Sequence, residues 1–130
     1  MNIPENLKYT EEHEWAKIED GTAVMGITDF AQKMLTDVVF VELPEVGKQV
    51  EKGKPFVVVE SVKSVSDVFA VLSGEVIAVN ETVADDPALV NQDPYGKGWL
   101  VKIKISSVGE TDSLLTHDAY LKLCEGEGNK

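Results

Sequence analysis

Residues 55–70 read PFVVVESVKSVSDVFA, and this stretch decides the fold that we expect. Two runs of apolar, mostly β-branched residues flank a polar centre from Glu60 to Asp67, which is the pattern of two strands joined by a tight turn. Lys63 stands in the middle of that centre. A hairpin in this register places Lys63 at or next to the turn, with its amine directed away from the sheet. The stretch therefore predicts a β-hairpin that presents a lysine at its tip.

Similar short runs continue on both sides of the hairpin and predict an all-β core. The strands that we expect cover residues 14–18, 22–27, 38–42, 55–60, 65–71, 75–80 and 99–105. Thr28 is suited to cap a short helix near 28–35, and Thr116 a C-terminal helix that ends at Gly126. A chain of 130 residues is long enough to bury its own core, so we expect one domain, residues 1–130.

A weak internal repeat adds to this picture. VFVE at 39–42 resembles VIAV at 76–79, and GKPFVVV at 53–59 resembles GWLVKI at 98–103. The midpoint between the copies falls near Lys63. Chance similarity among valine-rich strands is the alternative interpretation.

The charge balance indicates which partners to expect. The chain has 23 acidic and 12 basic side chains, a formal net charge of −11 at pH 7, and every basic one is a lysine. Phosphate-binding surfaces need clustered cations, and the arginine fork is the group that binds phosphate in bidentate fashion. The composition therefore disfavours nucleic acid and anionic membranes, and it favours docking on basic patches of larger enzymes.

The remaining reactive side chains do not suggest catalysis or a metal centre. His13, His117 and Cys124 fall on separate segments, without the spacing of a metal site. We expect His13 to be structural or a docking contact, and Cys124 to be a small buried hydrophobe on the terminal helix. Trp15 and Trp99 are expected in the core. The prediction is no catalytic residue, no metal ligand and no enzymatic activity.

The N-terminal residues indicate a compartment. Residues 1–15 read MNIPENLKYTEEHEW, without the apolar run of a signal peptide or the arginine-rich pattern of an organellar presequence. No window approaches the ~18 apolar residues of a membrane span, and a single cysteine excludes a disulfide within one chain. These features predict the cytoplasm of a bacterium, or a mature organellar protein.

The hairpin and its surroundings resemble the glycine cleavage H proteins, a family of lipoyl carriers. The attachment region reads ESVKSVSDV at 60–68, followed by SGEV at 73–76. The other similar segments are YTEEHEW at 9–15, GITDFAQ at 26–32, VFVELP at 39–44, LVNQDPY at 89–95 and GWL at 98–100. The resemblance runs from Leu7 to about Gly126 without large gaps.

Two comparisons within the wider superfamily refine the resemblance. Biotin carriers typically present Met-Lys-Met at the modified lysine. The lipoyl domains of 2-oxoacid dehydrogenases typically present Asp-Lys-Ala or Asp-Lys-Val. This chain instead has Val62 and Ser64 beside Lys63. One departure from the H-protein pattern is Val71, where the family usually carries a proline. The change removes some backbone rigidity without touching Lys63.

The resemblance implies a fold, a cofactor and partners. The fold would be a barrel-sandwich hybrid of the biotinyl/lipoyl-carrier type. Lys63 would bear lipoate in covalent linkage, an arm of about ten bonds and on the order of 13 Å. A lipoylating enzyme would attach it, and the arm would then visit a pyridoxal-phosphate glycine decarboxylase (P protein), an aminomethyltransferase (T protein) and dihydrolipoyl dehydrogenase (L protein). The chain would be a monomeric carrier of the aminomethyl group and of electrons.

The same resemblance assigns roles to further residues. Glu14 and Asp67 would line a cleft for the loaded arm, where a carboxylate can hold an ammonium group by a charge-assisted hydrogen bond. Both also fit solvated surface acids, and Asp67 fits a contact for the lipoylating enzyme. Glu60, Ser61 and Ser64 are expected to shape the hairpin or to be recognised by that enzyme.

Two other functions stay open at this level. An H-like relay protein donates its lipoyl group to other enzymes and needs the same lysine, so the hairpin does not distinguish it. An unmodified binding module of barrel-sandwich fold would keep Lys63 as an amine.

Overall fold

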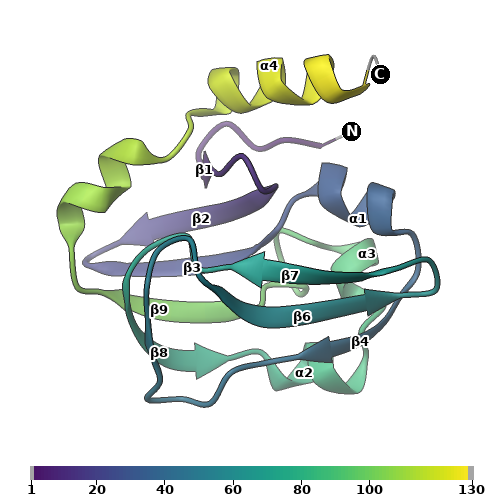
Figure 1. Ribbon diagram of the computed structural model, residues 1–130, viewed down its shortest axis with the longest axis horizontal. Helices are drawn as coiled ribbons and strands as arrows, with labels where there is room; N and C mark the ends of the chain where they lie inside the picture. The colour runs from purple at the N-terminus through teal and green to yellow at the C-terminus, as the bar shows by residue number, and fades with distance from the viewer. Residues whose placement is uncertain (1, 129–130) are drawn as a thin grey trace.

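The computed structural model describes residues 2–128 and consists mainly of two antiparallel sheets with short helices (Figure 1). The elements are β1 (Lys8–Tyr9), β2 (Glu14–Glu19), β3 (Thr22–Ile27), α1 (Asp29–Leu35), β4 (Val38–Glu42), β5 (Gln49–Val50), β6 (Pro55–Ser61), β7 (Val65–Phe69), β8 (Gly74–Val79), α2 (Glu81–Asp85), α3 (Leu89–Gln92), β9 (Val101–Ile105), the 3-10 helix η1 (Val108–Ser113) and α4 (His117–Gly128).

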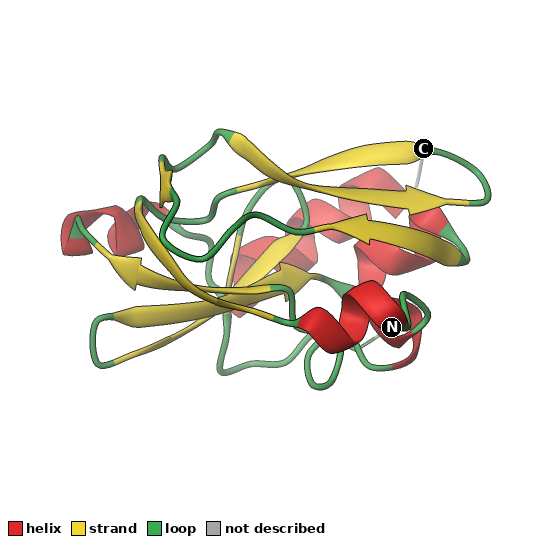
Figure 2. Cartoon of the chain, turned by 90° about the horizontal axis from the view of Figure 1, so that it is seen from below, coloured by secondary structure: helices red, strands yellow, loops and turns green. Residues whose placement is uncertain are grey.

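The larger sheet has the strand order β1-β2-β3-β9-β8-β5, and the smaller one has the order β4-β6-β7. Both sheets are open, and Figure 1 shows the smaller sheet in front of the larger one. Extended strands joined by loops and short helices make up most of the molecule (Figure 2). The predicted β-dominated class, with one helix near 28–35 and another near the C-terminus, is confirmed.

The main core lies between the two sheets and follows the period of two that strands impose. Val57 and Val59 of β6, Val41 of β4 and Val68 of β7 are buried, while the residues between them are more exposed. Complete burial of such a side chain stabilises the fold by about 1.5 kcal/mol or more. This alternation fixes which way each residue of the β6–β7 hairpin points.

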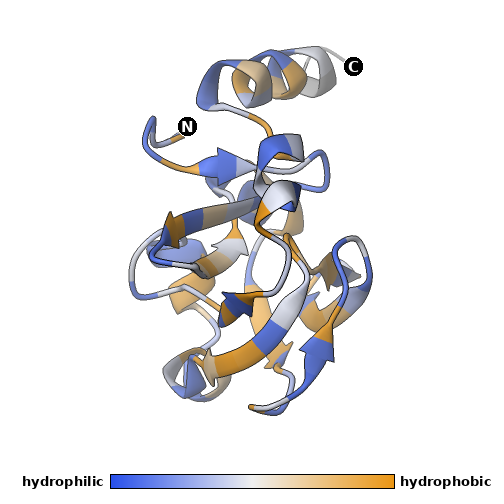
Figure 3. Ribbon diagram, turned by 90° about the vertical axis from the view of Figure 1, so that its left-hand side faces the viewer, coloured by the Kyte–Doolittle hydropathy of each residue, from blue (hydrophilic) through white to orange (hydrophobic). Residues whose placement is uncertain are grey.

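A second apolar cluster lies under α4. The ring of Tyr120 stacks on Tyr9 with centroids 4.6 Å apart, and the cluster also includes Cys124 and Trp15 at 3% and 2% exposure. The predicted burial of Cys124 and Trp15 is thus confirmed, whereas Trp99 is only partly buried. Hydrophobic residues (orange in Figure 3) concentrate on the strands, and α4 carries both kinds.

The strands predicted at residues 14–18 and 22–27 form a hairpin, and the predicted helix caps are confirmed. Asp20 and Gly21 both have positive φ, which suits a two-residue turn between β2 and β3. The Thr28 hydroxyl accepts from the Ala31 amide, and the Thr116 hydroxyl accepts from the Ala119 amide.

Some predicted boundaries are wrong, for local reasons. The terminal helix continues past Gly126 to Gly128, because Gly126 does not adopt the left-handed backbone that ends helices. The strand predicted from residue 99 begins at Val101, since the Asn80 side chain takes up the carbonyls of Lys97 and Trp99. The strand predicted to residue 71 ends at Phe69.

The helices α2, α3 and η1 were not expected. They have four to six residues each, too few to show a helical period in the sequence. Within residues 2–128, no helix is long and apolar enough to cross a membrane.

Candidate functional site

The tip of the β6–β7 hairpin is a tight turn of three residues, Val62, Lys63 and Ser64. The Ser61 amide donates to the Ser64 carbonyl across 2.8 Å, and the Ser61 hydroxyl accepts from the amides of Lys63 (3.2 Å) and Ser64 (3.0 Å). One serine therefore supports three backbone positions of the turn. The structure assigns Ser61 to hairpin geometry, one of the two roles expected for it, and Ser64 contributes its backbone.

The end of α1 supports this tip from below. The Val62 amide donates to the Asp37 carbonyl across 3.0 Å, and the Lys63 ammonium lies 3.4 Å from the Met34 carbonyl. Helix C-termini favour cations because their last carbonyls are negative. The Lys63 side chain is otherwise exposed to solvent, so an enzyme that encloses the tip has access to the amine.

Apolar side chains surround the exposed lysine. Val62 and Val65 are 69% and 65% exposed, and Met34 and Phe40 are about half exposed. Phe40 and Val65 flank Glu60 on the outer face of the small sheet, because Glu60 pairs with both in register. A charged residue in an apolar rim is suited to orient a docking enzyme, which keeps Glu60 as a candidate recognition residue.

A pocket of about 380 Å³ lies at the opposite end of β7, where Glu14 begins β2. The residues that line it come from distant segments and are Tyr9, Thr10, Glu11, Glu12, Glu14, Lys52, Gly53, Phe69, Ala70, Ser113, Leu114 and Leu115. The side chain of Glu14 crosses from the large sheet to the small one, where its Oε2 accepts a 2.6 Å hydrogen bond from the Phe69 amide.

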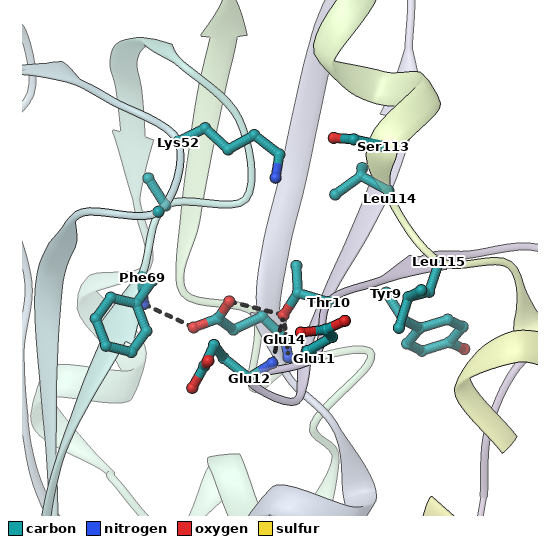
Figure 4. Close-up of a pocket in the computed structure, with 12 residues that line it drawn as sticks. Tyr9, Thr10, Glu11, Glu12, Glu14, Lys52, Phe69, Ser113, Leu114 and Leu115 are labelled. Atoms are coloured by element: carbon teal, nitrogen blue, oxygen red, sulfur yellow. Dashed lines mark hydrogen bonds between the residues drawn. The ribbon is translucent and has the colours of Figure 1, made fainter. Parts of the chain in front are cut away.

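The Glu14 carboxylate is buried and has two hydrogen-bond donors. Its Oε1 accepts from the Thr10 hydroxyl across 2.9 Å, opposite the bond from Phe69 (Figure 4). Burial raises the pKa of Glu14 to about 7, although both bonds lower it by favouring the ionised form. A carboxylate held in this way can bind an ammonium group, and its charge changes in the neutral pH range.

Other charges face the same space. Glu11 and Glu12 also line the pocket, and Figure 4 shows the Lys52 ammonium directed into it. The Lys52 backbone is fixed because its amide donates to the Ser73 hydroxyl, and Ser73 in turn donates to the Glu110 carboxylate from its amide and hydroxyl. The wall that carries Lys52 is thereby tied to η1.

Asp67 lies outside this pocket. It pairs in register with Val58, whose other neighbour is Glu42, and these residues line a broad groove on the outer face of the small sheet. The structure therefore does not bring Asp67 and Glu14 together in one cavity. Asp67 is exposed and stands between Lys63 and the pocket along β7.

His13 is part of a buried structural network, one of the two roles expected for it. Its Nδ1 lies 2.8 Å from the Tyr120 hydroxyl, which lies 2.6 Å from the Thr28 hydroxyl, and its ring stacks on Phe30. The network joins α4 to the cap of α1. Among the residues that the structure describes, no group of three or more His, Cys, Asp or Glu side chains is placed to hold a metal ion.

Sequence reasoning named Glu14 but missed the residues that define its environment. Thr10 stands in the segment YTEEHEW, four residues before Glu14, and a short polar side chain there was the available signal. The Phe69 amide gives no signal, because every non-proline residue has one. Lys52 resembles any other surface lysine in the sequence.

Comparisons with known proteins agree over nearly the whole chain. The family model described as Glycine cleavage H-protein matches residues 7–127. A glycine cleavage system H protein from Carboxydothermus hydrogenoformans is 54% identical over 126 residues, 97% of each chain. A probable glycine cleavage system H protein from Aeropyrum pernix is 54% identical over 92% of this chain and 84% of its own. The crystal structure of a glycine cleavage system H protein from Mycobacterium marinum superposes with a TM-score of 0.85, at 42% identity, over 97% of this chain and 99% of its own.

Proposed function

The chain belongs to the glycine cleavage H-protein family and is a lipoyl carrier of the glycine cleavage system, and we propose that Lys63 is the residue that bears the lipoyl group. The observation that supports this assignment is the tight turn that presents the Lys63 amine to solvent on a hairpin fixed by Ser61. The relay function is not favoured, because the relatives reported above are named for glycine cleavage.

The residues present fit this cofactor. When attached, the group supplies a cyclic disulfide that accepts a one-carbon amine and electrons. Acylation removes the charge of the Lys63 ammonium, and with it the cation that lies near the Met34 carbonyl. We propose that the chain itself contributes a rigid platform and acts as a carrier without enzymatic activity.

We further propose that the Glu14 pocket shelters the cargo amine between visits to the enzymes. Phe69 lies six residues after Lys63, a span of at most about 20 Å. About fifteen bonds join the Cα of Lys63 to an amine carried on the arm's sulfur, an extended length of about 19 Å. The arm therefore has to lie fully extended along β7, past Asp67, and only the amine at its end reaches the mouth of the pocket. Asp67 would contact the arm on its way.

The partners follow from the family and the charge. We propose docking on the P, T and L proteins of the glycine cleavage system and on a lipoylating enzyme. The net charge of −11 suits basic patches on these larger enzymes, and the apolar rim around Lys63 suits the entrance of an active site. A bacterial cytoplasm is the compartment that we propose, in keeping with bacterial relatives such as that of Carboxydothermus hydrogenoformans.

Intact-mass spectrometry on protein incubated with lipoate, ATP and a lipoate ligase tests the site. We expect a single lipoyl increment, located on the Lys63 hairpin by peptide mapping and absent from Lys63→Arg. Lys54→Arg, an exposed lysine at the other end of β6, is the matched control and should accept the increment. An increment that persists in Lys63→Arg would refute the assignment.

A second measurement addresses the pathway. Lipoylated protein is mixed with a glycine decarboxylase, and the exchange of labelled carbon dioxide into glycine is followed. We expect exchange that depends on lipoylation and is lost in Lys63→Arg. Lipoylated protein that supports no exchange would favour the relay function instead.

A further inference from the structure

We propose that Thr10 is the positioning residue that keeps the Glu14 carboxylate ionised and directed into the pocket. The inference deepens the proposed function, and its effect on the cargo rests on the amine entering this pocket.

Thr10 is bonded to the segment that carries Glu14 at several points. Its hydroxyl donates to Glu14 Oε1 (2.9 Å) and accepts from the amides of Glu12 (3.3 Å) and Glu14 (3.2 Å). Its backbone amide donates to the Glu14 carbonyl (3.0 Å), and its carbonyl accepts from the His13 amide (3.2 Å). One residue thus closes the loop before β2 and binds the carboxylate that this loop presents.

The hydroxyl of Thr10 is the side-chain donor to the carboxylate. Glu14 is 2% exposed, so water does little to stabilise its charge, and the second donor is the backbone amide of Phe69. A hydrogen bond to the ionised form lowers a carboxyl pKa, whereas burial raises it. Removal of the hydroxyl therefore shifts Glu14 toward the protonated form, while the Phe69 bond remains.

The other groups around Glu14 have both signs. From the loop before β2, Glu12 disfavours a further negative charge, and Glu11 also lines the pocket. From the turn at residues 51–53, Lys52 favours it. Tyr9 of β1 and Ser113 of η1 also line the pocket and are uncharged at neutral pH. Because Thr10 binds the carboxylate directly, its removal should shift the Glu14 pKa in a way that none of these groups compensates.

The ionisation matters for the cargo because of its chemistry. An amine on the carbon next to sulfur is lost when its lone pair forms a C=N bond, the C–S bond breaks and sulfur leaves as thiolate; water then gives formaldehyde and ammonia. An ionised carboxylate keeps the amine protonated and so occupies that lone pair. A protonated Glu14 cannot do this, so Thr10 should determine the pH range in which the pocket protects its cargo.

The first test uses the unmodified full-length protein and needs no cofactor. The carboxyl carbon of Glu14 is titrated by ¹³C NMR in wild type, Thr10→Val and Thr10→Ser, with Thr22→Val as the control, since the Thr22 hydroxyl bonds the Glu19 carbonyl away from the pocket. We expect a pKa about one unit higher in Thr10→Val, and wild-type values in Thr10→Ser and Thr22→Val. An unchanged Glu14 titration in Thr10→Val would overturn the inference; Thr10→Ala replaces Thr10→Val if the latter does not fold.

The second test measures the loss of ammonia from lipoylated protein loaded with glycine-derived cargo, as a function of pH. We expect the protected range of Thr10→Val to begin at a pH higher by the same amount as the titration shift, and Glu14→Gln to give no protection at any pH. If Glu14→Gln loses ammonia as slowly as wild type, the pocket does not hold the cargo, and the role of Thr10 in protection fails with it. The NMR titration distinguishes that outcome from a failure of the Thr10–Glu14 coupling itself.

Discussion

At one end of β7, Lys63 lies in solvent on a tight turn, and at the other end Glu14 lies 2% exposed against the Phe69 amide. The tip depends chiefly on the Ser61 hydroxyl, which binds amides two and three residues later in the sequence. The end of α1 adds one contact from Met34, 29 residues away in the sequence. The pocket depends on segments that only the fold brings together. The two ends of one strand therefore hold functional side chains by different physical means.

The difference has consequences for stability. An exposed lysine is hydrated before and after folding, so its substitution changes the free energy of unfolding little. A buried carboxylate loses hydration on folding, and its hydrogen bonds offset only part of that cost. We expect changes at the tip to alter function alone, and changes at the pocket to alter function and stability together.

The largest effect expected on this basis is the pH dependence contributed by Glu14. Its folded pKa of about 7 exceeds the ordinary value of 4.5, so the folded protein binds more protons between these values. The resulting stability is complete below about pH 4.5 and is lost as the pH rises through about 7. The total is at most about 3 kcal/mol.

Glu14→Gln removes this titration. As the pH rises from 5 to 8, the free energy of unfolding of the variant should therefore increase relative to that of wild type, by up to about 3 kcal/mol. Urea unfolding at several pH values measures the difference. Glu45→Gln, an exposed residue that does not line the pocket, should give a curve parallel to wild type. Parallel curves for Glu14→Gln would show that Glu14 does not titrate in this range.

A matched pair of valines sharpens the contrast between buried hairpin and exposed tip. Val59 is 0% exposed and Val62, three residues later, is 69% exposed. Val59→Ala deletes two buried methyl groups and leaves a cavity, so we expect a loss of about 2 kcal/mol. Val62→Ala should change stability by less than about 0.5 kcal/mol. Equal losses in urea unfolding would mean that the tip is packed more firmly than its exposure indicates.

A smaller effect is expected at Thr36, which caps α1 beneath the tip. Its φ of 64° and ψ of −148° lie in a region that suits glycine, and the residue is β-branched. Thr36→Gly relieves this strain but adds freedom to the unfolded chain, so we expect a net gain of about 1 kcal/mol. The same change at Thr82, in α2, should cost about 1 kcal/mol. Thermal unfolding compares the two variants. A loss of stability in Thr36→Gly would show that the Thr36 side chain stabilises the fold by more than the backbone strain destabilises it.

The hairpin could be predicted from the sequence because its determinants are local. The polar centre between two apolar runs locates the turn, and the alternation of Val57, Val59 and Val68 locates the buried face. Thr28 and Thr116 each cap a helix by a hydrogen bond to the amide three residues later, so these caps could also be predicted from the sequence. Helices of four or five residues were not, since they complete little more than one turn.

The pocket could be predicted only in part, because its contacts are between distant segments. Glu14 was named through family resemblance, but no pattern in residues 9–15 shows that Phe69 donates to it or that Lys52 faces it. Asp67 lines the outer groove and not the pocket that holds Glu14, and no pattern in residues 60–68 indicates this. Asp67 pairs with Val58 on the outer face, whereas the contact with Glu14 is made by the Phe69 backbone.

The smallest effect is expected from Asp67, and it tests how far the sheltered region extends. Because Asp67 is exposed and lies outside the pocket, its charge is screened and should hold the cargo amine weakly. On lipoylated, loaded protein we expect Asp67→Asn to speed the loss of ammonia by less than about twofold, equivalent to under about 0.5 kcal/mol, against the complete loss of protection expected for Glu14→Gln. Glu42→Gln, opposite Val58 on the same outer face, is the matched control and should match wild type. If Asp67→Asn matched Glu14→Gln instead, the amine would be held along the exposed strand, and the contrast between an open tip and a buried pocket would no longer explain how the cargo is protected.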